Sequence, residues 1–254
     1  MFLTTRLLVV CQLKLSNRWP HWSNERKSTK MDSLTTAPLM RLFKLSIAPK
    51  DQPALARVGQ HNLTTSMQQE AGTLAMYTAH TDALGADNVV IEVYRDDASY
   101  TIHAASEQFK AFREVAGQVV TQQQATPLTP ELLLQATAPY QAINDNALSV
   151  RLVTVDVQAA LALTFKASVV AEMKQAMAVE AGVLIMYAAR VTAEPTKWVF
   201  FEVYQSPQAY DDHCQTAHFK HYIAATKAAV LNKTMQVLTP DVLVHQGGWQ
   251  FENK

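Results

Sequence analysis

Apolar and polar residues alternate in two short segments of the chain, residues 43–47 (FKLSI) and residues 153–157 (VTVDV). Alternation with a period of two is typical of a β-strand that buries one face. The apolar positions that follow each segment fit one face of a helix: Leu55, Val58, Leu63 and Met67 in the first case, and Leu161, Phe165, Val169 and Met173 in the second. The pattern therefore predicts a strand followed by a helix, twice along the chain.

A further alternating stretch, NVVIEVYR at residues 88–95, has apolar residues on both of its faces. Val89, Ile91 and Val93 form a purely apolar face, and we expect this face to pack on the helices. Its even-numbered face carries Glu92 and Tyr94 among apolar residues. This face is expected to be covered by the other half of the chain, which repeats the pattern as WVFFEVYQ at residues 198–205.

The two halves of the chain are copies of one another at a constant offset of 110 positions. Residues 70–77 read EAGTLAMY and residues 180–187 read EAGVLIMY, and the other shared residues follow without a gap. Such agreement indicates two duplicated domains, each with its own core. Gly72 and Gly182 lie where the first helix of each copy must end, and a left-handed glycine is expected there.

We predict an α+β fold built from two tandem ferredoxin-like units with the order β-α-β-β-α-β. In each unit a second helix is expected at about 97–118 or 207–230, and a final strand near 129–134 or 239–244. Because both faces of each sheet are apolar, the two sheets should face each other and form a barrel within one chain. The predicted organisation is a leader (1–39), a first domain (40–136), a linker (137–148), a second domain (149–246) and a tail (247–254).

Composition and charge narrow the classes of function. The chain is 48% hydrophobic and 17% charged, as expected of a globular protein. Residues 1–30 carry six basic and one acidic side chain and the rest 16 basic and 21 acidic, so the acidic body argues against a nucleic-acid partner. The leader is expected to be disordered or to reflect an upstream start. No apolar run reaches the ~20 residues of a membrane span, and the two cysteines, Cys11 and Cys214, fit a cytoplasmic location.

Several common catalytic motifs are absent from the sequence: the glycine-rich dinucleotide and phosphate loops, the nucleophile elbow and the H-E-x-x-H zinc motif. What recurs is H-x-x-S-x-x-F at His103, Ser106 and Phe109, echoed as H-x-x-T-x-x-F from His213 onward. A spacing of three places these side chains along one side of the predicted second helix.

Together with E-A-G-x-x-x-x-Y and E-V-Y, these motifs resemble the antibiotic biosynthesis monooxygenase family, which includes quinol monooxygenases. The resemblance covers residues 40–136 and 150–246. It implies a dimeric α+β barrel, here fused into one chain, and a small aromatic or quinol-like substrate. It also implies oxygenation by dioxygen without a metal or flavin cofactor, and it leaves open whether two fused chains pair again as a homodimer.

The recurring polar residues are candidates for a site inside the apolar barrel. His103 and His213 are candidate catalytic bases because an imidazole titrates close to neutral pH. Glu92 and Glu202 are further catalytic candidates, either as bases or as partners that orient a histidine. The predicted substrate-binding residues are Tyr77, Tyr94, Tyr187, Tyr204, Trp198, Ser106 and Thr216.

Structural alternatives stand beside these roles, since the histidines can fasten helix to sheet and the glutamates can be paired core carboxylates. His213, His218 and His221 spread over a broad arc of helix surface, so no metal site is predicted. Arg113 and Ile223 stand where haem-degrading members of the family have a haem-ligating histidine, which disfavours haem degradation. The alternative functions are a non-catalytic small-molecule binding protein and an isomerase. Differences between the copies leave open which of them is active.

Overall fold

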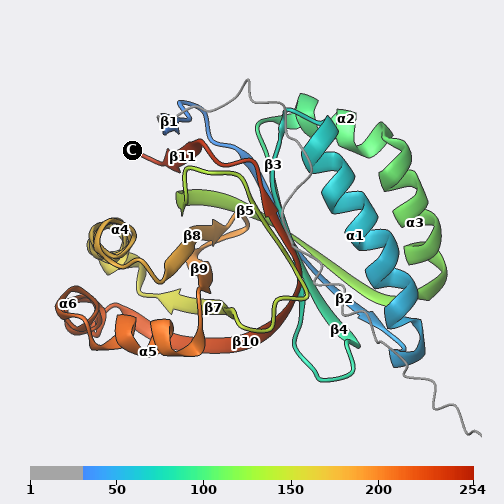
Figure 1. Cartoon of the computed structure of the whole chain (residues 1–254). Coiled ribbons are helices and arrows are strands. Elements are labelled where there is room, and N and C mark those ends of the chain that lie inside the picture. The colour runs from blue at the N-terminus through green and yellow to red at the C-terminus, as the bar shows by residue number, and fades with distance from the viewer. Residues whose placement is uncertain (1–30) are drawn as a thin grey trace, which may run out of the picture.

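The computed structural model describes residues 31–254, so the predicted leader lies outside the described residues apart from its last positions. Two units with the predicted order confirm the α+β fold class (Figure 1). The first unit comprises β2 (Leu39–Ile47), α1 (Gln52–Gln69), β3 (Thr73–His80), β4 (Asp87–Tyr94), α2 (Asp97–Ala105), α3 (Glu107–Val119) and β5 (Val120–Gln135). The second comprises β7 (Ser149–Val157), α4 (Ala162–Val179), β8 (Val183–Val191), β9 (Glu194–Tyr204), α5 (Pro207–Gln215), α6 (Ala217–Thr226) and β10 (Val230–His245). Short 3-10 turns, η1 (Pro49–Asp51) and η2 (Ala159–Leu161), precede α1 and α4.

Within the described range, eight strands close into one barrel in the order β5-β2-β4-β3-β10-β7-β9-β8, with β8 pairing back onto β5. Two of these pairings, β3 with β10 and β5 with β8, join one unit to the other, and both are antiparallel. Helices α1–α3 cover the outside of the first sheet and α4–α6 the outside of the second (Figure 1). The predicted barrel within one chain is therefore confirmed.

Strands β5 and β10, of 16 residues each, are much longer than predicted because each serves both units. The first half of β5 pairs with β2 of its own unit and the second half with β8 of the other unit. The partner changes at Leu128, and a bulge follows at Glu131, whose buried carboxylate pairs with Arg190 of the second unit. Asp241 lies at the equivalent bulge of β10 and pairs with His80 of the first unit at 3.0 Å. The bulged carboxylates thus tie the two units together where the long strands change partners.

The predicted single second helix is broken in both units. Ser106 and Thr216 have extended backbone angles and separate α2 from α3 and α5 from α6. The Ser106 hydroxyl accepts a hydrogen bond from the Phe109 amide at 3.3 Å, and the Thr216 hydroxyl accepts one from the Phe219 amide at 3.2 Å. Serine and threonine favour this N-cap arrangement. The two residues predicted to bind substrate therefore begin helices.

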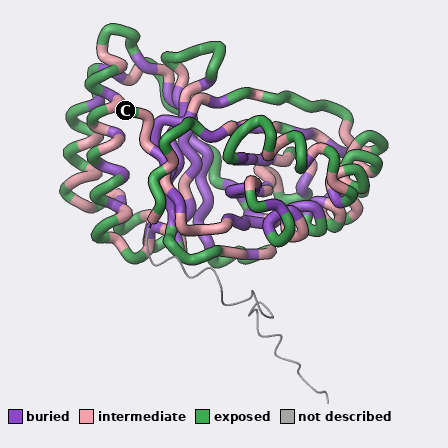
Figure 2. Tube along the Cα trace, turned by 90° about the horizontal axis from the view of Figure 1, so that it is seen from above, coloured by how far each residue is buried: buried purple, intermediate pink, exposed green. Residues whose placement is uncertain are grey.

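The predicted orientation of β4 and β9 is wrong. The odd-numbered residues of β4, such as Ile91, fill the barrel interior together with Phe201 and Tyr187 of the second unit. The face that carries the glutamate and tyrosine packs under the helices instead, where Tyr94 contacts the core formed with Leu63 of α1. Figure 2 shows the buried strands at the centre of the molecule. Alternation reveals two faces but cannot say what covers each when both are apolar.

The glycines of the repeated phrase have a different role from the one predicted. Positive φ angles among the described glycines occur at Gly85, Gly247 and Gly248, and not at Gly72 or Gly182. A Cβ atom at Gly72 would lie 2.0 Å from the Oγ atom of a serine in α2, and one at Gly182 would lie 2.6 Å from the Cβ of an alanine in α5. Glycine is therefore required so that the next helix can pack closely on this turn.

The predicted linker and tail contain short strands of the same sheet system. The linker includes β6 (Tyr140–Ile143), which pairs with β10. The tail includes β11 (Trp249–Glu252), which pairs antiparallel with β5 and parallel with β1 (Asp32–Ser33). The end of the chain thus returns to the first unit, as Figure 1 shows.

Unfolding experiments should reveal one buried histidine at the end of β10. His245 is 1% exposed, its Nδ1 accepts a hydrogen bond from the Gly247 amide at 3.1 Å, and its ring stacks on Tyr140. Burial lowers the pKa of His245 from 6.5 to about 3. Below pH 6.5 the histidine of the unfolded chain therefore binds a proton, whereas the buried His245 of the folded chain stays neutral down to about pH 3. The free energy of unfolding is therefore highest above pH 6.5 and decreases as the pH falls. At pH 5 the loss is about 2 kcal/mol.

The control for this expectation is His245→Gln, because Gln135 occupies the equivalent position of the first unit. Urea unfolding of both proteins at pH 7.5 and pH 5 should show that wild type loses about 2 kcal/mol more than the variant. Equal losses in the two proteins would contradict a neutral, buried His245.

Candidate functional site

A cavity of about 700 Å³ lies in the first unit between the outer face of the sheet and the helices that cover it. Strands β2 and β4 and the beginning of β5 form its floor, and α1, α2 and α3 form its roof. Its wall is mostly apolar and includes Phe43, Leu63, Val90, Phe109 and Phe112. The predicted pocket inside the barrel is therefore replaced by one outside it, because core side chains of both units fill the barrel interior.

Three polar side chains form one corner of the cavity wall: Arg41, Glu92 and Tyr100. Arg41 and Glu92 are paired residues of β2 and β4, and the Arg41 guanidinium lies 3.8 Å from the centre of the Tyr100 ring. Glu92 is only 8% exposed, and burial raises its pKa although the nearby His103 and Arg41 lower it in part. The Asn62 Oδ1 in the same wall is buried and has no hydrogen-bond partner. The cavity therefore offers a proton acceptor, a cation and a free acceptor for a polar ligand.

His103 lies behind this wall rather than in it. Its side chain is fully buried between Tyr94 and Phe109, and its Nδ1 donates to the Glu70 carboxylate at 3.0 Å. Gln108 also donates to Glu70, at 2.7 Å. Burial raises the pKa of Glu70, but the hydrogen bonds from His103 and a threonine outweigh it, so that the pKa is lowered overall. In this structure His103 can reach a ligand only through the residues of the wall.

Glu70 was not among the predicted site residues, although one signal could have identified it. It is the first letter of the repeated phrase, and Glu180 holds His213 in the second unit at 3.0 Å just as Glu70 holds His103. A carboxylate and a histidine that recur together in both copies are expected to be hydrogen-bonded to each other. The structural alternative proposed for the histidines was that they fasten helix to sheet; these contacts instead join α2 and α5 to the carboxylates that follow α1 and α4.

The predicted tyrosines separate into two groups. Tyr77 and Tyr187 meet at the centre of the barrel, where their hydroxyl groups lie 3.1 Å apart and Tyr187 donates to Gln135 at 2.7 Å. Burial raises the pKa of both well above 10. Tyr94 and Tyr204 lie under the helices, beside the two histidines. The structure therefore keeps Tyr77 and Tyr187 away from the cavity.

The same place in the second unit is almost filled and retains a space of about 30 Å³. Phe200 stands there in place of Val90, and Met235 in place of an alanine. Trp198, which replaces an asparagine, packs against Phe200 with ring centres 5.9 Å apart. Glu202 remains, but it accepts a hydrogen bond from Tyr204 at 3.0 Å, and burial raises its pKa. Larger side chains have thus removed the cavity from one of two equivalent sites.

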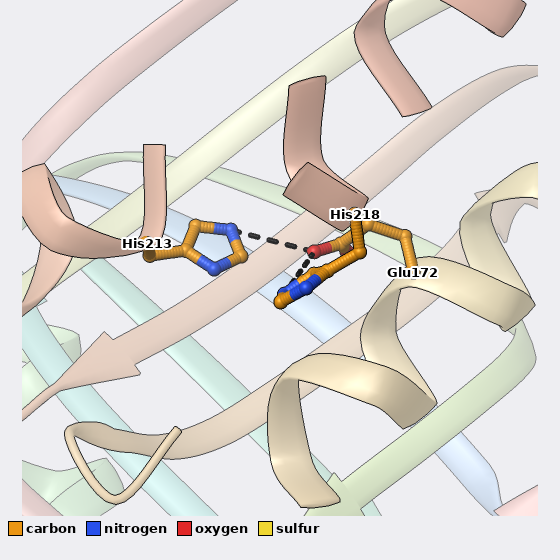
Figure 3. Close-up of side chains that lie close together, drawn as sticks. All are labelled: Glu172, His213 and His218. Carbon is orange, nitrogen blue, oxygen red and sulfur yellow. Dashed lines mark ion pairs between the residues drawn. The ribbon is translucent and has the colours of Figure 1, made fainter. Parts of the chain in front are cut away.

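A cluster of one glutamate and two histidines lies beside this filled site (Figure 3). His213 Nε2 is 3.6 Å from Glu172 Oε1, and His218 Nε2 is 4.0 Å from the same oxygen. Burial, together with the charges of Glu202 and Glu180, raises the pKa of Glu172 to about 8. The first unit has an asparagine and a glutamine in place of Glu172 and His218.

Comparison with known proteins identifies the family. The family model described as "Antibiotic biosynthesis monooxygenase" matches the chain twice, over residues 38–115 and 150–225, which together exceed half of its length. The chain belongs to this family. It carries two tandem domains of the antibiotic biosynthesis monooxygenase type, and the resemblance seen in the sequence motifs is confirmed.

Two solved structures resemble this chain over most of its length. A "putative monooxygenase" from Lactobacillus acidophilus NCFM is 33% identical, with a TM-score of 0.78 over 84% of this chain and 98% of that chain. Another, from Fusobacterium nucleatum, is 18% identical, with a TM-score of 0.79 over 87% of this chain and 100% of that one, and so shows the fold alone. No curated protein matches the chain. In the part of this family member that the structure describes, no helix is long and apolar enough to cross a membrane.

Proposed function

We propose that this chain is a monooxygenase that oxidises a small quinol or phenol with dioxygen in the cavity of the first unit, without a metal or flavin. The observation that carries the proposal is a buried carboxylate, Glu92, in the wall of a mostly apolar cavity of about 700 Å³. A cavity of this size and lining suits a small aromatic molecule. The family membership of the chain supports the reaction type.

Glu92 is the proposed general base. Its raised pKa brings it closer to that of a phenolic hydroxyl than an ordinary carboxylate would be, which favours proton transfer. The Arg41 guanidinium beside it would stabilise the phenolate that forms. The Asn62 Oδ1 would accept a hydrogen bond from a second substrate hydroxyl. His103 is proposed to position this wall from behind and not to touch substrate.

The electron-rich phenolate would then react directly with dioxygen. One oxygen atom enters the ring of the substrate and the other leaves as water, and the substrate supplies both hydrogens and all the electrons. For a simple hydroquinone the product is a hydroxyquinone and one molecule of water. No further oxidant or reductant is needed.

The test is oxygen uptake by purified, chelator-treated, flavin-free protein with a panel of hydroquinones and phenols. We expect turnover with at least one compound, and incorporation of one ¹⁸O atom from ¹⁸O₂ into the product. Binding of these compounds without oxygen uptake would overturn the proposal and favour the alternative of a non-catalytic binding protein. The double variant His103→Ala, His213→Ala distinguishes an enzyme from a binding protein. An enzyme should lose turnover while it stays folded, whereas a binding protein should keep its ligand affinity and has no turnover to lose.

A further inference from the structure

The cluster of Glu172, His213 and His218 joins the three helices of the second unit. Glu172 lies on α4, His213 near the end of α5, and His218 near the start of α6 (Figure 3). One ligand atom from each residue lies within 4.8 Å of the other two. Two imidazoles and one carboxylate are the donor set that zinc and similar divalent ions prefer in proteins.

Glu172 has the burial and the unpaired oxygen that suit a metal ligand. It is only 7% exposed, and its Oε1 has no hydrogen-bond partner although it points at the two histidine rings. A buried carboxylate oxygen is normally hydrogen-bonded or paired with a charge. A cation between this oxygen and the imidazoles would satisfy it.

The neighbouring Glu180 orients His213 for such an ion. His213 Nδ1 lies 3.0 Å from Glu180 Oε1, so that a proton on Nδ1 is held by Glu180 and Nε2 faces Glu172 with a free lone pair. A carboxylate on the second nitrogen is the usual partner of a metal-bound histidine. His218 Nε2 lies 2.6 Å from the same Glu180 oxygen and 4.0 Å from Glu172 Oε1, so binding an ion would exchange its contact with Glu180 for the metal bond. The His218 side chain is 19% exposed, so the cluster is reached from solvent on its side.

The first unit shows that the fold itself does not require these residues. Asn62 and Gln108 stand in place of Glu172 and His218, and Gln108 satisfies the carboxylate of Glu70 by a direct hydrogen bond of 2.7 Å. Within this cluster the second unit therefore differs from its copy at two positions, and both differences introduce metal-ligating side chains. His218 takes over the contact that Gln108 makes with the repeated glutamate, whereas the Glu172 oxygen gains no hydrogen-bond partner in exchange.

We propose that Glu172, His213 and His218 bind one divalent transition-metal ion of the Zn²⁺ type. The two histidine nitrogens lie 3.6 and 4.0 Å from Glu172 Oε1, and all three ligand atoms lie within 4.8 Å of one another. A tetrahedral site with bonds of about 2.0–2.2 Å spaces its ligand atoms ~3.4 Å apart, so side-chain rotation closes the remaining difference. Water fills the fourth position, and Glu180 remains on His213 Nδ1. The ion fastens α4, α5 and α6 over the filled site of the second unit, apart from the cavity of the first unit, so this proposal stands independently of the proposed oxidation.

The test uses the full chain after chelator treatment and dialysis. Calorimetric titration with ZnCl₂ should show one equivalent bound, and CoCl₂ should produce the visible absorption bands of a low-coordinate site. Saturating Zn²⁺ should also raise the melting temperature, because an ion that binds only the folded chain stabilises it. The variant Glu172→Asn, His218→Gln, which copies the first unit, should weaken Zn²⁺ binding by about 100-fold or more.

The matched control is His221→Ala, which removes an exposed histidine next to the cluster and copies Ala111 of the first unit. It should bind Zn²⁺ like wild type. Melting curves recorded in chelator establish that each variant is folded, and the single variant Glu172→Gln repeats the test with the smallest change of shape. Failure of wild type to bind one Zn²⁺, or undiminished binding by a folded double variant, overturns the proposal.

Discussion

Replacing Glu92 with glutamine is expected to lower kcat for quinol or phenol oxidation by about 100-fold or more, with substrate affinity changed only a few-fold. Glutamine keeps the shape of the side chain and its place beside Arg41, but it cannot accept the substrate proton. The measurements are oxygen uptake for kcat and anaerobic calorimetric titration for the dissociation constant. Loss of turnover with retained binding is the signature of a missing base rather than of a damaged pocket.

The second unit supplies a matched control for this substitution. Glu202 occupies the equivalent position of β9 and is also buried, but it faces a space of only about 30 Å³. Glu202→Gln should therefore leave kcat unchanged. A Glu92→Gln enzyme that works like wild type would remove Glu92 from the reaction, and equal losses in both variants would indicate a general effect on the barrel.

The substitution Val90→Phe is expected to abolish substrate binding and turnover by filling the cavity. Phe200 fills the equivalent space of the second unit, so the fold already contains a phenylalanine at this position. The new ring would occupy the room between β4 and the helices that the substrate ring needs. Anaerobic titration should detect no binding at substrate concentrations about 100-fold above the wild-type dissociation constant, which corresponds to a loss of at least about 2.7 kcal/mol.

Stability distinguishes this outcome from simple misfolding. Because the ring enters an existing cavity, the melting temperature of Val90→Phe should match or exceed that of wild type. The reverse change, Phe200→Val, should instead destabilise the protein by roughly 1–3 kcal/mol, because it leaves a void in a packed core. Full binding by a folded Val90→Phe protein would place the substrate elsewhere.

Periodicity predicted the elements of the barrel but not the covering of each face. The order of strands and helices was predicted from the repeat at a fixed offset. The pairing of the two copies was predicted because both faces of each sheet are apolar. Both faces of β4 are apolar, however, so only the three-dimensional structure shows that Ile91 enters the barrel while Glu92 turns toward the helices. The sequence did contain a signal for the break in the second helix, because Ser106 and Thr216 are residues that favour an N-cap. Their spacing of three from the histidines was interpreted instead as one continuous helix.

The candidate site was predicted in its residue types and not in its geometry. Glu92 and His103 lie close together. The sequence does not show which of them reaches the cavity, and His103 is buried behind the wall to which Glu92 belongs. The cluster of Glu172, His213 and His218 was not predicted, for a related reason. Spacing along one helix directed attention to His221, whereas Glu172 comes from another helix some forty positions earlier. Comparison of the two copies, which shows asparagine replaced by Glu172, was the available signal.

The shared strands β5 and β10 explain why the chain retains a second unit whose pocket is filled. In a barrel made from two identical chains, any substitution that closes one pocket closes both, because symmetry copies it. Fusion removes that constraint, so the second unit was free to accumulate large side chains such as Phe200 without harming the first. The second unit nevertheless cannot be discarded. Strands β5 and β10 each end in the opposite unit, and without that partner the first unit would be left with two exposed sheet edges.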